Sequence, residues 1–191
     1  ALENRTAIAR ILPELFSGLK VRHLSPYFIA LRNSLQNLAP KKIQNPRIVI
    51  LTPGPSNETY FEHSYLSSYL GYTLVQGEDL MVKDNYVWLK TIGGLEKVDV
   101  IIRRVDDVYC DPLELREDSR LGVSGLLQAV RSGNVTIANP LGSSILENPG
   151  LMGFLPRLAR RLLGEELILP TIASWWCGQA KELQYVLDNL E

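Results

Sequence analysis

The sequence predicts an α/β protein built on a Rossmann-like, open and mainly parallel sheet with helices on both faces, preceded by N-terminal helices. Two observations predict this fold class. Between residues 47 and 138, short runs of β-branched and aliphatic residues recur without polar interruption, as in parallel strands that are buried on both faces. Segments long enough for helical crossovers separate several of these runs, and such crossovers join neighbouring parallel strands.

The composition excludes several classes of protein. Of the 191 residues, 46% are hydrophobic and 21% are charged, which is typical of a globular domain. A net charge of -1 provides no general basic surface for nucleic acid or for an anionic membrane. No apolar run reaches the roughly 18 to 20 residues of a membrane-spanning helix, and no secretory leader opens the chain. We therefore expect a cytoplasmic protein that binds neither nucleic acid nor membrane.

Cysteine and histidine are too few to build a structural framework. Cys110 and Cys177 have no CxxC spacing and no histidine near them. A single disulfide between them stays open, but two cysteines do not make a disulfide scaffold. Since His23 and His63 are the only histidines, we expect no metal site in this chain.

Two helices are expected before the sheet. Residues 3–17 carry apolar side chains at helical spacing, and Pro13 inside this pattern predicts a kink or a break. Residues 25–38 form the second helix, which Ser25 opens as an N-cap with a proline behind it. A polar, proline-containing linker then leads to the sheet.

The first strand, helix and strand follow in order. Residues 47–52 form a short aliphatic strand that ends in a loop rich in proline and glycine. Residues 58–70 form a helix that ends at Gly71, because glycine readily adopts the left-handed conformation that closes a helix. Residues 72–75 form the second strand.

The remaining elements combine a hairpin with further strands and helices. Residues 80–90 alternate about an Asp-Asn pair and predict a β-hairpin, and a Gly-Gly pair makes the next turn. Residues 98–105 form a core strand that ends in four charged side chains, residues 123–131 a helix, and residues 135–138 a further strand. A long helix is expected over residues 151–163.

Three loops are candidates for a functional site. Ligands bind open parallel sheets beyond the carboxyl ends of the strands. This rule selects residues 52–60, 103–111 and 139–147. The chain contains neither the G-x-G-x-x-G fingerprint of dinucleotide-binding domains nor the G-x-x-x-x-G-K-[ST] phosphate loop.

The first loop places Gly54 between two prolines and just before a helix. Backbone N–H groups at such a position form a generic cradle for a carboxylate or another anion, with Asn57 beside it. The alternative is an ordinary strand-to-helix turn that Ser56 or Asn57 caps.

The second loop is the most informative one. It carries Arg103, Arg104, Asp106 and Asp107 at the end of a buried strand, where charges cost desolvation energy unless they pair or face a ligand. Arginine suits the two-pronged binding of a carboxylate or phosphate, and aspartate can orient it. The alternative is an internal Arg–Asp network that only fixes the loop.

The third loop and one helix add weaker candidates. Asn139 follows the last core strand, where its side chain can contact a substrate, and the alternative is a loop that caps a helix. His63 lies in the helix after the first loop, where we expect a surface histidine with a structural or solvated role. The residues alone assign no catalytic group.

Several motifs together resemble the circularly permuted ATP-grasp proteins of the second type, which are similar to glutathionylspermidine synthetases. The matching segments run in order along nearly the whole chain: residues 2–5, 12–16, 51–63, 98–107, 133–139 and 163–166. One departure from the pattern is the Glu-Asn-Pro at residues 147–149, where many ATP-grasp proteins carry Asp-Lys.

This resemblance implies an activity and an organisation. ATP-grasp enzymes use ATP to convert a carboxylate to an acylphosphate, which an amine or thiol then attacks. By this resemblance, residues 1–40 are an N-terminal helical segment and residues 41–165 a Rossmann-like substrate domain, the pre-ATP-grasp domain. Residues 166–191 begin the small ATP-grasp lobe, which the chain enters through a helix and a strand near residues 169–170.

The resemblance also sets expectations for ligands and partners. ATP and magnesium are expected in the full-length protein but not in this segment, which we expect to be inactive alone. Its expected partners are the remaining ATP-grasp lobes of the same chain, a small carboxylate substrate and a helical partner domain.

Two other functions stay open beside the ligase domain. One is a non-catalytic Rossmann-like scaffold or interaction module that binds a partner through Trp175 and Trp176, whose exposure would leave an apolar patch. The other is an α/β domain that binds a nucleotide or nucleotide-sugar. In the leading hypothesis, the substrate site is formed by Gly54, Asn57, Arg103, Arg104, Asp106, Asp107 and Asn139.

Overall fold

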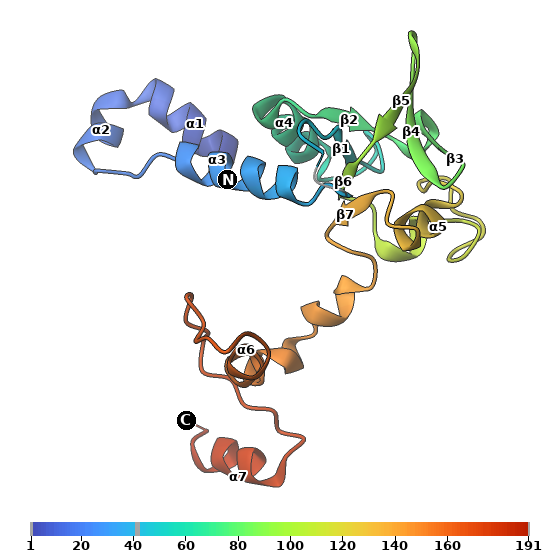
Figure 1. Cartoon of the computed structure of the whole chain (residues 1–191). Helices are drawn as coiled ribbons and strands as arrows, with labels where there is room; N and C mark the ends of the chain where they lie inside the picture. The colour runs from blue at the N-terminus through green and yellow to red at the C-terminus, as the bar shows by residue number, and fades with distance from the viewer. Residues whose placement is uncertain (1, 41–42, 191) are drawn as a thin grey trace. The chain divides into compact units, whose positions relative to one another are not determined.

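The computed structural model describes residues 2–40 and 43–190 (Figure 1). The chain divides into two compact units, Ala1–Pro140 and Leu141–Glu191. The first unit contains two sheets, one parallel and one antiparallel, together with the helices that cover them.

The parallel sheet confirms the predicted fold class. Its strands are β1 (Ile48–Leu51), β2 (Thr73–Val75), β6 (Val100–Arg103) and β7 (Thr136–Ala138). They lie in the order β2-β1-β6-β7, and every pair is parallel. The chain runs outward from β1 to β2 and then returns to the other side of β1 for β6 and β7. The direction of winding therefore reverses between β1 and β6.

Helices cover both faces of this sheet. Helix α4 (Tyr60–Leu70) joins β1 to β2, and α5 (Leu126–Arg131) joins β6 to β7. Because parallel crossovers are right-handed and the two connections wind in opposite directions, α4 and α5 lie on opposite faces. Helix α3 (Ser25–Asn37) packs on the face of α4.

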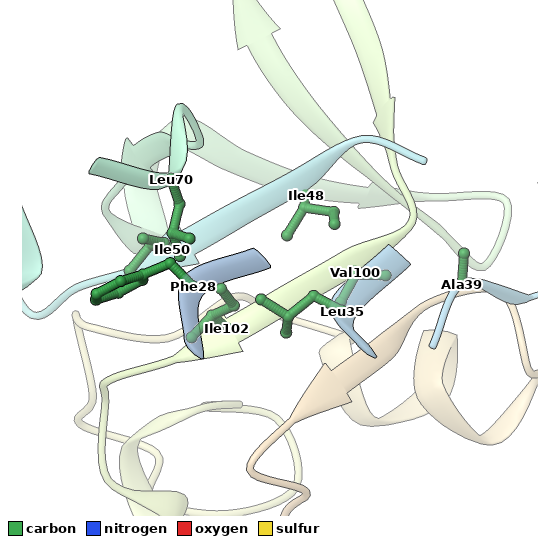
Figure 2. Close-up of a cluster of buried hydrophobic side chains, with 8 residues drawn as sticks. All are labelled: Phe28, Leu35, Ala39, Ile48, Ile50, Leu70, Val100 and Ile102. Carbon is green, nitrogen blue, oxygen red and sulfur yellow. The ribbon is translucent and has the colours of Figure 1, made fainter. Parts of the chain in front are cut away.

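The main apolar cluster lies between α3, α4 and one face of the sheet (Figure 2). Phe28 and Leu35 of α3 pack over Ile50 and Ile102, and Leu70 of α4 closes the cluster. All four residues of β1 are at most 5% exposed, since the opposite face of the strand is covered as well. Burial on both faces explains why the strand carries no polar residue.

The antiparallel sheet consists of β3 (Leu80–Lys83), β4 (Tyr86–Thr91) and β5 (Gly94–Val98), in that order. The predicted hairpin is confirmed. Asp84 and Asn85 form its turn with φ angles of 53° and 61°, as a two-residue hairpin turn requires.

The strand predicted over residues 98–105 is shorter than expected. Residues 94–98 belong to the antiparallel sheet, and β6 begins only at Val100. Asp99 separates the two strands, and its carboxylate accepts the backbone N–H of Arg47 at 2.9 Å. The chain thus passes from one sheet to the other at Asp99, whose buried carboxylate is held by the backbone of Arg47.

The N-terminal helices follow the prediction with one difference. Helix α1 (Leu2–Ile11) and α2 (Pro13–Gly18) are separate, because a proline inside a helix removes a hydrogen bond and clashes with the preceding turn. Helix α3 begins at Ser25 itself, and its N-cap position is Leu24, whose side chain makes no capping hydrogen bond.

The second unit contains α6 (Leu155–Leu163) and α7 (Ala180–Asp188). The long helix predicted over residues 151–163 is two pieces: a 3₁₀ turn precedes α6, and Pro156 lies in the first turn of α6, where its missing N–H costs nothing. The prediction of a strand near residues 169–170 is wrong, because residues 164–179 contain no strand.

No helix among residues 2–40 and 43–190 combines the length and apolar character needed to cross a membrane.

We predict that Ile50→Ala lowers the free energy of unfolding by about 2–5 kcal/mol, because it leaves a cavity in a strand buried on both faces. Urea unfolding followed by circular dichroism measures the change. Ile92→Ala is the matched control: the same side chain is fully exposed in the β4–β5 turn, so its removal should leave stability unchanged. Equal effects of the two substitutions would contradict the assignment of the core.

Candidate functional site

The carboxyl ends of β1 and β6 lie side by side where the winding reverses. Leu51 pairs with Arg103, and the backbone N–H of Arg104 donates to the carbonyl of Leu51 at 2.9 Å. The loops that follow the two strands therefore start next to each other. In open α/β sheets this switch point is where ligands bind.

Arg103 is a structural residue of the strand end. Its guanidinium donates to the carbonyls of Asn139 at 2.9 Å and Val105 at 2.7 Å, and it forms an ion pair with Asp107 at 2.5 Å. Only 10% of its side chain is exposed. The internal Arg–Asp network that the sequence left open is present for this pair, and it ties the ends of β6 and β7 together.

Asn139 completes the same arrangement. Its side-chain amide donates to the carbonyl of Arg103 at 3.3 Å, so the two residues are linked in both directions. Its φ angle is 64°, a left-handed conformation that asparagine tolerates better than most residues. Asn139 therefore helps to fix the conformation of the strand end.

Arg104 and Asp106 differ from their neighbours. Both side chains are exposed, and neither forms a hydrogen bond or ion pair within the described part of the chain. The charge of Arg104 is nevertheless close enough to lower the pKa of His63 on α4. The strand end thus holds one guanidinium fixed in place and one that is available.

His63 is buried, which corrects the expectation of a surface histidine. It is 1% exposed, and its Nδ1 lies 2.9 Å from the hydroxyl of Thr52 at the end of β1. Its Nε2 lies 3.0 Å from the hydroxyl of Thr59. Two ring nitrogens with two partners explain why an imidazole is accommodated inside the sheet–helix contact.

The direction of this hydrogen-bond chain follows from its last acceptor. The Thr59 hydroxyl donates to the carboxamide oxygen of Asn57 at 2.6 Å, so it must accept from Nε2–H of His63. Burial lowers the pKa of His63, so the ring is neutral at neutral pH, and its Nδ1 accepts from the hydroxyl of Thr52. That hydroxyl also accepts the backbone N–H of Gly54 at 3.3 Å. The chain therefore runs from Gly54 to Asn57 and closes the first loop on itself.

Gly54 and Asn57 have local roles in this loop. The carboxamide oxygen of Asn57 also accepts the backbone N–H of Thr59 at 2.9 Å, as in the turn that the sequence left open. Gly54 has a φ of 100°, and a Cβ there would overlap the side-chain oxygen of Gln76. The sequence predicted that Gly54 lies just before a helix. In the structure residues 55–59 separate Gly54 from α4, so Gly54 does not adjoin the helix N-terminus.

The third loop is divided between the two units. Asn139 and Pro140 end the first unit, whereas residues 143–147 form a 3₁₀ turn in the second. Gly142, Ser143 and Ser144 of this loop therefore belong to a different unit from Asn139.

Sequence reasoning missed Asp111, the buried carboxylate that organises the second loop. It is 0% exposed and accepts the backbone N–H groups of Leu113, Gly125 and Leu127 at 3.0, 3.1 and 2.9 Å. These hydrogen bonds hold the long loop after β6 to the start of α5. The Asp-Pro dipeptide signals a turn, but nothing in the sequence points to partners 14 and 16 residues away.

The cysteines are free thiols. Cys110 is buried, and burial raises its pKa to about 11, so it stays a neutral, unreactive thiol at ordinary pH. Among residues 2–40 and 43–190, no group of three or more His, Cys, Asp or Glu side chains is arranged to hold a metal ion.

These features define a class: a Rossmann-like α/β domain whose candidate ligand site lies at the switch point of its sheet. The chain belongs to the circularly permuted ATP-grasp type 2 family, which it matches over residues 1–191. The family resemblance seen in the sequence is therefore confirmed. Membership relates the chain to domains of ATP-dependent ligases.

Three relatives illustrate the match. The uncharacterized protein Rv2567 of Mycobacterium tuberculosis is 46% identical over 190 residues, which cover 100% of this chain and 22% of the relative. Protein sll0335 of Synechocystis sp. is 38% identical over 189 residues, 99% of this chain and 39% of its own length. ML0605 of Mycobacterium leprae is 40% identical over 189 residues, which cover 99% of this chain and 34% of the relative. The chain thus spans well under half of each relative.

We predict that Arg103 and Asp107 stabilise the fold cooperatively. A double-mutant cycle of Arg103→Ala and Asp107→Ala should give a coupling energy of about 1–2 kcal/mol, since both side chains are largely shielded from solvent. The exposed pair Arg116–Asp118 is the matched control and should show no measurable coupling. Additive effects at Arg103 and Asp107 would contradict the network.

We also predict that His63 makes stability fall in mild acid. Burial, and secondarily the charge of Arg104, lower the pKa of His63 below its usual 6.5. Below pH 6.5 the unfolded chain therefore takes up a proton that the folded chain resists, so this contribution to stability is present above pH 6.5 and is lost as the pH falls.

Urea unfolding at pH 6.5 and 5.5 measures this effect. The loss for the wild type should exceed that for His63→Gln by up to about 1 kcal/mol. The exposed His23 serves as the control, because His23→Gln should keep the full wild-type loss. An identical loss in the His63 variant would disprove the assignment.

Proposed function

We propose that this chain is the substrate-binding domain of an ATP-dependent ligase that joins a carboxylate to an amine or thiol. Arg104 is its receptor for the carboxylate of the acid. One observation carries the proposal: the switch point places an unpaired guanidinium beside the first loop, while its neighbour Arg103 is used to fix the strand end.

Each neighbouring group has a role in this proposal. The guanidinium of Arg104 offers a planar pair of donors that fits both oxygens of a carboxylate. Asp106, also unpaired, orients Arg104 or accepts an ammonium group of the substrate. Gly54 and Asn57 shape the loop that faces the acid, and Arg103, Asp107 and Asn139 hold the opposite side in place.

The strand end does not suit magnesium. Two of its four charged residues are cationic, and one of its two carboxylates is paired with Arg103. Magnesium prefers carboxylates and other oxygen ligands without competing cations. We propose that ATP and magnesium bind to other lobes of the full-length protein, where the acylphosphate forms, and that the domain alone does not catalyse the reaction.

We also propose that the full-length protein acts in the cytoplasm, where ATP is available, and that its resemblance to glutathionylspermidine synthetases extends to a peptide-like acid with an amine or thiol acceptor. The second unit is the part of the chain that meets the other lobes. Its apolar side chains are largely exposed, with Trp175 and Trp176 47% and 48% exposed.

The same exposed surface favours one alternative, a non-catalytic module that only binds partner domains. The presence or absence of turnover in the full-length protein separates the two functions. If this chain alone bound ATP and magnesium with micromolar affinity, the third alternative, a nucleotide-binding domain, would replace both.

We predict that Arg104→Ala in the full-length protein abolishes acid-dependent ATP hydrolysis but leaves ATP binding intact. Phosphate release is measured with glutamate, glutathione and short peptides as acids and with spermidine or cysteine as nucleophile. Losing the two charge-assisted hydrogen bonds should reduce kcat/KM by at least about 100-fold. Arg104→Lys should recover part of it, because lysine keeps the charge without the planar fork.

Arg116→Ala is the matched control, since Arg116 lies in the same long loop but is exposed and paired with Asp118. It should retain full activity. Unchanged turnover in Arg104→Ala would remove Arg104 from the site, and absence of turnover in the wild type with every acid would favour the non-catalytic module.

A further inference from the structure

A cleft lies in the first unit, separate from the candidate site at the switch point. Its volume is about 310 Å³, at the lower end of the roughly 300–1,000 Å³ of small-molecule sites. Residues of β3 form one side, and Lys90 of β4, Arg120 and Ser124 form the rim. The cleft lies between the antiparallel sheet and the long loop after β6.

The floor of this cleft is made of closely packed backbone. A Cβ on Gly77 would overlap the carbonyl of Gly122, and a Cβ on Gly122 would overlap the carbonyl of Tyr109. Neither position therefore accepts a side chain without moving the main chain. Asp111 anchors the same loop through its three backbone hydrogen bonds, so the cleft is formed before any ligand arrives.

Two cations are directed to this cleft. The ammonium of Lys90 donates to the carbonyl of Glu78 at 2.7 Å, which holds it at the rim and leaves its other two N–H groups available. The guanidinium of Arg120 has no hydrogen-bond or ion-pair partner among the described residues. With the carboxylate of Glu78, the three charged groups sum to a single positive charge.

Backbone donors add to the two cations. Within the described part of the chain, the amide N–H groups of Gly122 and Ser124 donate to no acceptor. The apolar side chains of Leu80 and Val123 line the remainder. Cationic and neutral donors beside a small apolar surface match a short organic anion rather than a cation or a long apolar ligand.

We propose that this cleft binds a small anion that carries a carboxylate or phosphate group, with Lys90 and Arg120 as its charge-assisted donors. The site does not depend on the proposed ligase function. It is close to the first loop in space, because the side chain of Gln76, one residue before Gly77, packs against Gly54. A ligand in the cleft would therefore affect the position of Gln76 and, through it, the first loop at the switch point.

The test titrates the isotope-labelled chain with inorganic phosphate and, separately, with succinate, and follows backbone amide shifts by NMR at low ionic strength. We expect saturable shifts at Gly122 and Ser124. The double variant Lys90→Gln/Arg120→Gln should weaken binding by about 100-fold, tenfold for each lost charge-assisted contact. A stronger response to phosphate or to succinate identifies the preferred group.

Matched variants keep the test decisive. Lys83→Gln removes an exposed lysine from the same sheet outside the cleft and should leave binding unchanged. Glu78→Gln removes a repelling carboxylate and should strengthen the binding of either anion. The proposal would be overturned if the wild type showed no saturable shifts. It would also be overturned if the double variant bound the anions as tightly as the wild type, or if Glu78→Gln bound them more weakly.

Discussion

Strand β1 is buried on both faces, and the arrangement of the first unit depends on this constraint. A strand whose four residues are at most 5% exposed needs cover on each side; α3 and α4 pack on one face of the sheet, and the crossover helix α5 lies on the other. The chain covers both faces by reversing its winding beside β1. The same reversal leaves a gap in helix cover at the strand ends, which is where polar side chains can gather without leaving the sheet.

At this place two adjacent arginines have different tasks. Arg103 donates to two carbonyls and to Asp107, so its charge is consumed in holding β6 and β7 at a fixed separation. Arg104 follows it with no such partner, and alternation along the chain turns its side chain toward α4 and His63. Arg103 therefore fixes the strand end, and the guanidinium of Arg104 is available to a ligand.

Much of this could be predicted from local pattern. The aliphatic runs, the Asp-Asn turn and Pro13 are signals carried within a few residues, and each gave the correct element. The boundary between β5 and β6 and the role of Asp111 depend on partners far along the chain, Arg47 and Leu127. The burial of His63 depends on how α4 packs against the end of β1, where Thr52 lies. Periodicity contains no information about such partners, so these features could not be deduced.

The hydrogen-bond chain through His63 has a consequence for how this domain can diverge. Its protons point one way, from Gly54 through Thr52, His63 and Thr59 to Asn57, because the Asn57 oxygen can only accept and the neutral His63 ring carries a single N–H. Serine could stand in for either threonine, whereas valine would leave a ring nitrogen without its partner. A replacement that cannot hydrogen-bond at any one of these three central positions therefore leaves a neighbouring polar group without its partner and interrupts the hydrogen bonds that close the loop.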